Sequence, residues 1–157
     1  VIPNGLWSSS EKKKINILGN RLGSSSIYEP DPNMFDLHNI KKKDYQNFEI
    51  TNRIEMQCET LDKSLKNLNI TKLDYLKIDT QGFEKEVLDG ATLSLKNIFA
   101  VQLELSIQPL YDGQELYKYF FSFFEKSGFS LWSLEPVFED KKTGKLLQFD
   151  AIFIKNE

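Results

Sequence analysis

The sequence contains one cysteine, one histidine and no long apolar run. Cys58 alone can form neither an intramolecular disulfide nor a cysteine metal cluster, so the hydrophobic core has to hold the fold. His38 alone argues against a histidine-based zinc site and against a catalytic triad. No stretch approaches the roughly 20 apolar residues that span a bilayer, and no signal-peptide pattern opens the chain. We therefore expect a cytoplasmic protein with no metal site and no membrane partner.

Two catalytic motifs are also missing. The chain has no glycine-rich phosphate-binding loop and no serine nucleophile elbow, which argues against phosphoryl transfer and serine hydrolysis. The net charge of -3 gives no reason to expect a nucleic acid as partner. With 157 residues, of which 40% are hydrophobic, the chain suits a single domain over residues 1–157.

The hydrophobic pattern predicts strands and helices in alternation, which is typical of an α/β fold. The order of strand, helix and strand over residues 73–105 predicts a parallel pair with a right-handed connection. The last two strands are expected to form an antiparallel hairpin that closes the sheet. Predicted strands cover residues 1–3, 15–18, 48–58 (at a sheet edge), 73–79, 98–105, 129–138 and 146–154; predicted helices cover 61–68, 83–95 and 113–127; residues 19–33 form a loop, and the lysines at 41–43 a solvated charged run.

Residues 76–85 are the most informative segment. An apolar strand there runs directly into Asp79, a glycine turn at Gly82 and a helix. In open parallel sheets the ligand crevice lies beyond the carboxyl ends of the strands, so Asp79 is a candidate functional residue. The alternative is that Asp79 and Thr80 only cap the following helix. Glu84, in the first helical turn, is favoured by the helix dipole and can equally be a capping residue.

Alternation along two neighbouring strands predicts a cluster of charged side chains. Lys77 and Asp79 share one face of the first strand, and parallel pairing would bring Glu104 of the next strand beside them. Charges on a covered parallel sheet need a reason, because unpaired buried charge is costly. Two explanations remain open: a structural ion pair between Lys77 and Glu104, or a site that binds a polar ligand and positions a base. Asp150 is a weaker candidate that can simply pair with a neighbour.

Residues 73–84, LDYLKIDTQGFE, followed by EVLDGA at 86–91, resemble the signature region of the FkbM-type methyltransferases. The resemblance implies a Rossmann-like class I methyltransferase fold, with a mostly parallel sheet whose last two strands form a hairpin. It also implies S-adenosylmethionine as cofactor and methyl transfer to a hydroxyl, often of a sugar or natural product. Further segments that carry the resemblance are residues 5–7, 23–26, 60–62, 102–106, 109–113 and 150–153.

One part of the family pattern has no counterpart in the sequence. The glycine-rich turn that cradles the cofactor, and the acidic residue that binds its ribose, would precede Val1. The chain thus resembles the carboxyl-terminal two thirds of the domain, with the N-terminal strands missing from the sheet, and such a fragment alone is expected to be inactive. The strand that would lie beside residues 73–79 is one of those missing. We therefore expect an exposed sheet edge there, through which a homodimer could form.

The resemblance also assigns roles to individual residues. Asp79 is the candidate base, with Glu104 and Lys77 as its supporting partners. The expected cofactor contacts are Asn4, Gly5, Asp79 and Gln81, and the expected contacts with the hydroxyl acceptor are Ser24, Ser25, Ser26, Glu84 and Tyr111. The alternative function is a non-catalytic carbohydrate-binding or interaction domain that retains the fold, which the absence of the glycine loop favours.

Overall fold

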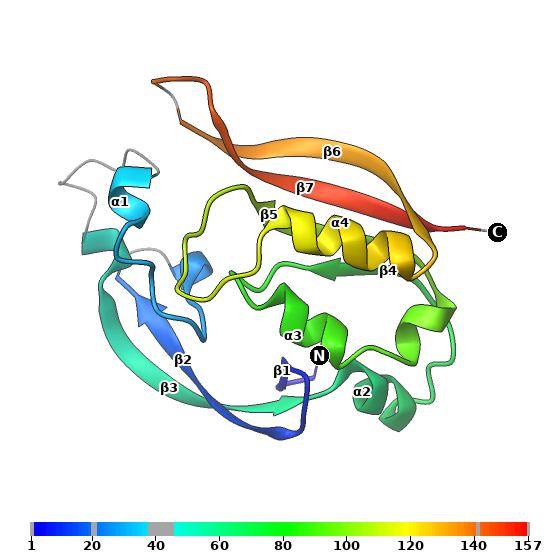
Figure 1. Ribbon diagram of the computed structural model, residues 1–157. Helices are drawn as coiled ribbons and strands as arrows, with labels where there is room; N and C mark the ends of the chain where they lie inside the picture. The colour runs from blue at the N-terminus through cyan, green and yellow to red at the C-terminus, as the bar shows by residue number, and fades with distance from the viewer. Residues whose placement is uncertain (1, 20–21, 38–45, 141, 157) are drawn as a thin grey trace.

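The computed structural model describes residues 2–19, 22–37, 46–140 and 142–156, which form a mixed α/β structure with two sheets (Figure 1). His38 and the lysines at 41–43 lie outside the described residues. The three-stranded sheet has the order β1-β3-β2 and contains β1 (Gly5–Leu6), β2 (Glu11–Leu18) and β3 (Ile50–Glu59). The four-stranded sheet has the order β4-β5-β7-β6 and contains β4 (Leu73–Ile78), β5 (Ile98–Ser106), β6 (Phe129–Glu139) and β7 (Leu146–Lys155). The helices are α1 (Met34–Leu37), α2 (Leu61–Asn67), α3 (Glu84–Asp89) and α4 (Tyr117–Lys126), with 3-10 turns η1 (Leu22–Ser24) and η3 (Ser94–Asn97).

The four-stranded sheet confirms the predicted pairing. Strands β4 and β5 are parallel, with Leu76 opposite Val101 and Ile78 opposite Leu103. Strands β6 and β7 form the predicted antiparallel hairpin, and β7 also pairs antiparallel with β5. Because both strands of the β4–β5 pair run in the same direction, the residues that follow β4 and those near the end of β5 meet at one edge of the sheet.

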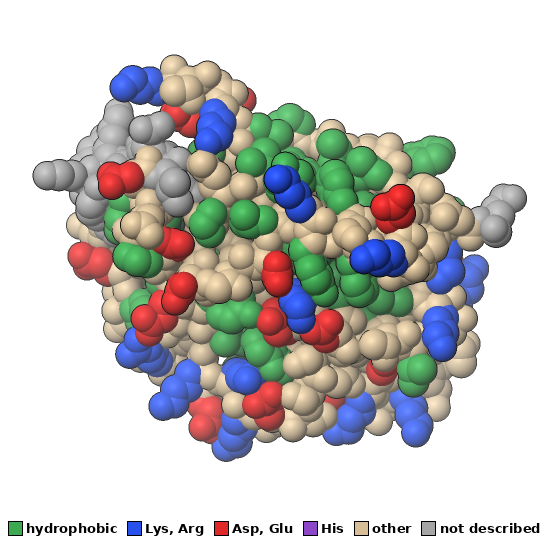
Figure 2. All heavy atoms as spheres, in the orientation of Figure 1, with side chains coloured by type: hydrophobic (Ala, Val, Ile, Leu, Met, Phe, Trp, Pro, Cys, Tyr) green, Lys and Arg blue, Asp and Glu red, His purple; other side chains and the backbone are tan. Residues whose placement is uncertain are grey.

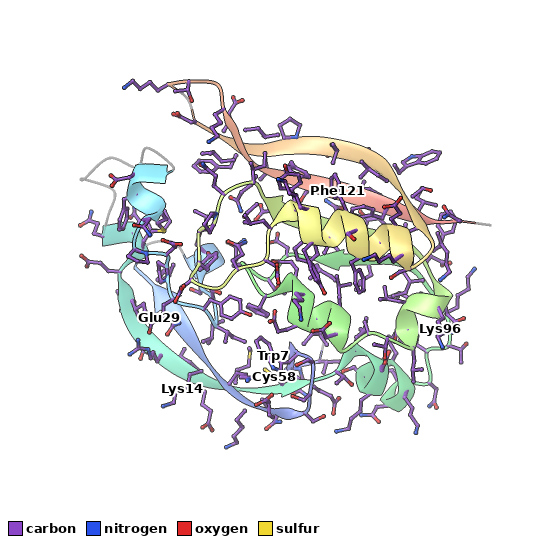
Figure 3. All side chains as sticks on the ribbon, in the orientation of Figure 1. Trp7, Lys14, Glu29, Cys58, Lys96 and Phe121 are labelled. Carbon is purple, nitrogen blue, oxygen red and sulfur yellow. The ribbon has the colours of Figure 1, made fainter. Side chains whose placement is uncertain are left out.

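Helices α3 and α4 bury their apolar sides against this sheet. Phe124 of α4 stacks on Phe153 of β7 with 4.2 Å between ring centroids, and Phe121 contacts the same strand edge-on (Figure 3). Helix α3 lies between the two sheets in Figure 1, and its Val87 is fully buried in the same core as Trp7 and Cys58. One core cluster therefore joins the two sheets, and it is rich in aromatic side chains, as the composition of the chain predicts.

The three-stranded sheet differs from the prediction in two places. Strand β3 is the central strand of this small sheet and not an edge strand of the large one. The predicted strand at residues 1–3 is wrong for the described Ile2 and Pro3, and a strand begins instead at Gly5, opposite Cys58. A β-carbon at Gly5 would lie 2.5 Å from Met56 Cε, so a larger residue at this position would displace the flexible end of the Met56 side chain. Hydrophobic periodicity alone does not reveal such pairing partners.

The helix predicted over residues 83–95 is divided in the structure. Helix α3 ends at Asp89, and the chain turns at Gly90 before η3. A β-carbon at Gly90 would lie 2.2 Å from the carbonyl oxygen of Trp7, so the chain approaches β1 where only glycine fits. Ala91 and Leu95 are buried, as their spacing predicts, although they do not continue the helix. The helix predicted from residue 113 likewise begins later, at Tyr117.

Charged side chains of both signs are interspersed over the face displayed in Figure 2, with lysines and arginines frequent along the border where β2 and β3 lie. Several of them are paired, as in the 2.6 Å ion pair between Lys12 and Glu55. Within the described ranges no helix is long and apolar enough to cross a membrane.

Candidate active site after strand β4

The turn that follows β4 is built by a buried carboxylate. Glu84 is 2% exposed, and its Oε1 accepts hydrogen bonds from the backbone amides of Thr80 and Gly82, both at 3.1 Å. The hydroxyl of Thr80 donates to the same oxygen at 3.2 Å. Burial raises the pKa of Glu84 above its ordinary value, although these hydrogen bonds lower it in part. Gly82 has a φ of +106°, which confirms the predicted glycine turn.

Gln81 joins the two candidate carboxylates. Its Nε2 donates to Oδ1 of Asp79 at 3.0 Å and to Oε2 of Glu104 at 3.1 Å. Gln148 of β7 donates to the same oxygen of Glu104 at 3.3 Å. The predicted meeting of Asp79 and Glu104 at the end of two parallel strands is therefore found, with an amide group between them.

The structure shows which carboxylate pairs with Lys77. Its Nζ lies 3.4 Å from Oδ2 of Asp79, and no ion pair joins it to Glu104, both of which are described residues. The register explains this, because Lys77 lies opposite Gln102 and Glu104 lies two residues further along β5. The charge of Asp79 raises the pKa of Lys77, which favours the ammonium form. The proposed structural pair between Lys77 and Glu104 is therefore wrong.

Glu104 lies in an environment that disfavours its charged form. Burial, followed by the charge of Asp79, raises the pKa of Glu104 to about 6, while the hydrogen bond from Gln81 acts in the opposite direction. Asp150 lies opposite Glu104 on β7 and adds further repulsion. Asp150 itself accepts a hydrogen bond of 2.5 Å from Gln102, so it pairs with a neighbour, as the simpler explanation expects. Glu104 therefore exchanges its proton closer to neutral pH than an ordinary glutamate does.

Two loops meet at this turn. The hydroxyl of Tyr111 donates to the carbonyl oxygen of Ser24 at 2.7 Å and lies 3.0 Å from Oε1 of Gln81. The hydroxyl of Ser26 donates to the carbonyl oxygen of Gln81 at 2.6 Å. A β-carbon at Gly82 would lie 2.9 Å from the ring of Tyr111, so glycine is needed for this contact as well as for the turn. The structure thus brings Ser24, Ser26 and Tyr111 to the carboxylates, although they are distant in sequence.

Three of the predicted acceptor contacts have their polar groups already engaged. The hydroxyl of Ser25 accepts a hydrogen bond from the backbone amide of Leu18 at 3.3 Å, away from the carboxylates. Ser26 is fully buried, and the buried carboxylate of Glu84 accepts hydrogen bonds from the backbone amides of the turn. The contact of these three residues with an acceptor stays a prediction, which the burial of Ser26 and Glu84 does not favour.

Gly5 lies in the three-stranded sheet and Asn4 directly precedes it, whereas the carboxylates lie at the end of β4 and β5 in the other sheet. Gly5 faces the side chains of Met56 and Cys58, and within the described ranges no hydrogen bond joins Asn4 or Gly5 to Asp79. Their contact with a cofactor stays a prediction. Gln81, the other predicted cofactor contact, uses its amide group to hold the carboxylates together.

Sequence reasoning missed Gln148 and Gln102, which donate hydrogen bonds to Glu104 and Asp150. A signal for Gln148 was present, because it alternates with Asp150 along the final strand and so shares the face of Glu104. Within the described residues, no group of three or more His, Cys, Asp or Glu side chains is arranged to hold a metal ion.

Comparison with known proteins bears on the identity of this site. A search of curated proteins and a search of solved structures found no significant match. A family model, described as the methyltransferase FkbM domain, matches residues 4–131, which include β4, β5 and the two residues, Lys77 and Gln81, that bind Asp79 among those the structure describes. The match covers well over half of the chain and confirms the resemblance carried by residues 73–91. The chain belongs to the FkbM methyltransferase domain family.

Proposed function

We propose that this chain carries the catalytic carboxylates of an S-adenosylmethionine-dependent O-methyltransferase, whose acceptor is a hydroxyl group of a sugar or another natural product. Family membership supplies the reaction class. The observation that carries the proposal is the meeting of Asp79 and Glu104 beyond the carboxyl ends of parallel strands β4 and β5, bridged by Gln81. This is the edge at which open α/β sheets bind ligands.

The chemistry of this donor set fits the positively charged end of the cofactor. The side chain of Asp79 is 38% exposed, so one of its faces is accessible to a ligand. Glu104 and Asp79 together carry more negative charge than Lys77 offsets, which favours a sulfonium or ammonium group nearby. Asp79 is therefore the residue that we expect beside the methyl donor.

S-adenosylmethionine, when bound, supplies an electrophilic methyl group and keeps the electron pair of the broken carbon–sulfur bond as a neutral thioether. Asp79 takes the proton that the acceptor hydroxyl loses as its oxygen becomes methylated. Proton removal by a positioned carboxylate makes the oxygen a better nucleophile, and orientation lowers the entropic part of the barrier.

Lys77 and Glu104 support this step in different ways. Lys77, at 3.4 Å from Asp79, stabilises its carboxylate before the acceptor binds. Glu104, whose pKa is raised to about 6 by burial and by Asp79, can share the negative charge or accept a proton near neutral pH. Asp79, the proposed base, thus lies beside Glu104, a second carboxyl group that titrates close to the working pH of most enzymes.

The first experiment is a calorimetric titration of S-adenosylhomocysteine into the 157-residue chain and into a form extended upstream of Val1. Because the resemblance places the glycine-rich turn before Val1, we expect saturable binding to the extended form, with an affinity about tenfold or more above that of the short chain. The absence of binding to both forms would contradict the proposal.

The second experiment measures methyl transfer from isotopically labelled S-adenosylmethionine to a panel of sugars and hydroxylated natural products. The variants are made in the form of the protein that binds S-adenosylhomocysteine in the first experiment, called here the binding-competent form. In this form Asp79→Asn is expected to lower the rate about 100-fold or more while leaving S-adenosylhomocysteine bound. Asp74→Asn is the matched control, because Asp74 is on β4, the strand that leads to Asp79, and its side chain is 82% exposed. Full activity of Asp79→Asn would rule out Asp79 as the base.

A non-catalytic carbohydrate-binding module is the second candidate function. It is supported by the engagement of Ser26, Gln81 and Glu84 in hydrogen bonds within the protein, which leaves fewer groups free to contact a substrate. A chain that binds sugars from the panel but never S-adenosylhomocysteine would favour this function over methyl transfer.

We further propose that the free edge of β4 pairs with another strand. In the part of the chain that the structure describes, β4 is the terminal strand of its sheet, and Tyr75 on it is 46% exposed. An unpaired edge of a parallel sheet is a site for strand addition. Sedimentation analysis of the chain tests this: a concentration-dependent dimer that Leu73→Pro abolishes would support pairing through β4.

A further inference from the structure

We propose that Gln81 is a positioning residue, which holds the carboxylates of Asp79 and Glu104 in place and is itself anchored by the loops that carry Ser26 and Tyr111. The inference deepens the proposed function and rests on it for the catalytic role of the carboxylates. The positioning can nevertheless be measured without cofactor or acceptor.

The backbone of Gln81 is the first observation. Its φ of +58° lies in the left-handed region, which a residue with a side chain rarely adopts. Glycine would relieve this strain, yet the turn carries glutamine there and glycine only at the next position, Gly82. The surrounding contacts maintain the conformation, because Ser26 donates to the carbonyl oxygen of Gln81 and Glu84 binds the amide of Gly82. A strained residue that is held so firmly by its surroundings points to a function for its side chain.

The hydrogen bonds of the Gln81 amide are the second observation. Its nitrogen has two donors, which go to Asp79 and Glu104, and its oxygen lies 3.0 Å from the hydroxyl of Tyr111. Both donors of the side chain are therefore directed to the candidate carboxylates, and its oxygen faces Tyr111. In the opposite orientation the amide oxygen would face two carboxylate oxygens, and neither Asp79 nor Glu104 would receive a hydrogen bond from Gln81. The contacts thus fix a single orientation of the amide.

The electrostatic surroundings explain why such a group is needed. The charged groups that act on Glu104 are Asp79 and Lys77 from the β4 end, Asp150 from β7 and Glu84 from α3, so negative charges outnumber positive ones. Repulsion would drive the carboxylates of Asp79 and Glu104 apart if nothing bound both. A neutral amide with two donors offsets that repulsion without adding a charge. A lysine at this position would add a positive charge, and an ionised glutamate would add a negative charge and offer no donor.

The test compares Gln81→Met, which keeps the length of the side chain but removes its donors, with Gln81→Gly, which removes the side chain and relieves the backbone strain. The measurement is a carbon-13 NMR titration of the glutamate side-chain carboxyl groups in the 157-residue chain, with Glu104→Gln used to assign the Glu104 signal. The hydrogen bond from Gln81 lowers the pKa of Glu104. Both variants should therefore shift its titration midpoint upward by about half a pH unit or more.

Gln57→Met is the control, because the Gln57 amide donates to backbone carbonyl groups of the three-stranded sheet, far from Glu104 in the fold. Should Gln81→Met fail to fold, Gln81→Gly still decides the matter, since glycine suits the backbone. A Glu104 midpoint that is unchanged in the folded variants would overturn the inference.

In the binding-competent form, Gln81→Gly is also expected to lower the methyl-transfer rate about tenfold or more without the same loss of S-adenosylhomocysteine binding. A shifted midpoint in a protein that never binds S-adenosylhomocysteine would support the positioning and count against the proposed function alone.

Discussion

The carboxylate of Glu84 and the backbone amide of Gly82 lie 3.1 Å apart, although Glu84 is on the helix that this turn introduces and is almost completely buried. The same oxygen also binds the amide of Thr80. A single buried side chain thus satisfies backbone groups that would otherwise face the protein interior without partners, and it fixes the turn that presents Asp79 and Gln81.

Replacing Glu84 with alanine should destabilise the protein. The substitution leaves the amides of Thr80 and Gly82 without their acceptor, and we expect the free energy of unfolding to fall by about 2–3 kcal/mol. Urea denaturation followed by circular dichroism measures this change. Glu125→Ala, on the exposed side of α4, is the control and should stay within about 0.5 kcal/mol of the parent protein. A Glu84→Ala protein as stable as this control would show that the hydrogen bonds are replaced by water.

Two features of Gly82 make a substitution there costly: its left-handed backbone and its close contact with Tyr111. Gly113 has the left-handed backbone without a close contact, so comparing the two positions separates the two costs. At Gly113, φ is +75° and nothing lies within 4 Å of the position that a β-carbon would take, whereas at Gly82 the ring of Tyr111 lies 2.9 Å from that position. We expect Gly113→Ala to cost about 1 kcal/mol through backbone strain and Gly82→Ala about 1–2 kcal/mol more through the added clash. Thermal and urea unfolding of both variants measure the difference. Equal losses would mean that Tyr111 moves aside freely.

The raised pKa of Glu104 predicts a pH dependence of stability. Its folded-state pKa of about 6 exceeds the ordinary value of 4.5, so the folded protein binds this proton more tightly than the unfolded chain does. The stabilisation is complete below pH 4.5 and is lost as the pH rises through 6. After allowance for partial exposure to solvent, the loss is about 1 kcal/mol. Unfolding free energies at about pH 4 and about pH 7.5 should therefore differ less in Glu104→Gln than in the parent protein by about that amount. An identical pH dependence in both proteins would contradict the prediction.

The strands of the site could be predicted because their signal is local. In β4 and β5, apolar residues alternate with Lys77, Gln102 and Glu104, and period-two alternation assigns each side chain to a face without knowledge of the rest of the fold. The apolar positions of α3 were also predicted correctly. The end of that helix was not, because it depends on the contact of Gly90 with Trp7, which is distant in sequence. Periodicity reports burial, but it does not report where a helix stops.

Most hydrogen bonds of the candidate site could not be predicted for a related reason. Alternation along β7 indicates the face on which Gln148 lies, but it does not indicate which group Gln148 binds. Gln81 lies in a turn, where no hydrophobic pattern indicates that its amide binds Glu104. The choice of Asp79 over Glu104 as the partner of Lys77 likewise depends on strand register, which pairs Lys77 with Gln102. The family signature located the site, and the tertiary structure supplied its connections.

The turn between α3 and η3 depends on Asp62 of α2. Its carboxylate accepts hydrogen bonds from the backbone amides of Leu93 at 2.9 Å and Ser94 at 2.7 Å, and from the hydroxyl groups of Thr92 and Ser94. Although burial acts to raise the pKa of Asp62, these hydrogen bonds prevail and lower it below its ordinary value of 3.8. The carboxylate therefore stabilises the folded state above pH 3.8, and this contribution disappears as the pH falls below that value.

Asp62→Ala should accordingly lower the free energy of unfolding by about 2 kcal/mol at neutral pH, because the amides of Leu93 and Ser94 lose a charged acceptor. The difference between variant and parent protein should begin to shrink below pH 3.8, and it should disappear as the pH falls through the lowered pKa of the folded carboxylate, where the parent carboxylate becomes protonated as well. Urea unfolding at about pH 7 and at several pH values down to about pH 2.5 measures both effects. Asp74→Ala, which removes only the exposed 3.1 Å ion pair with Lys72, is the control and should change stability by less than about 0.5 kcal/mol at each pH. If the Asp62→Ala deficit were as large in acid as at neutral pH, packing of the aspartate, and not its charge, would have to hold the turn.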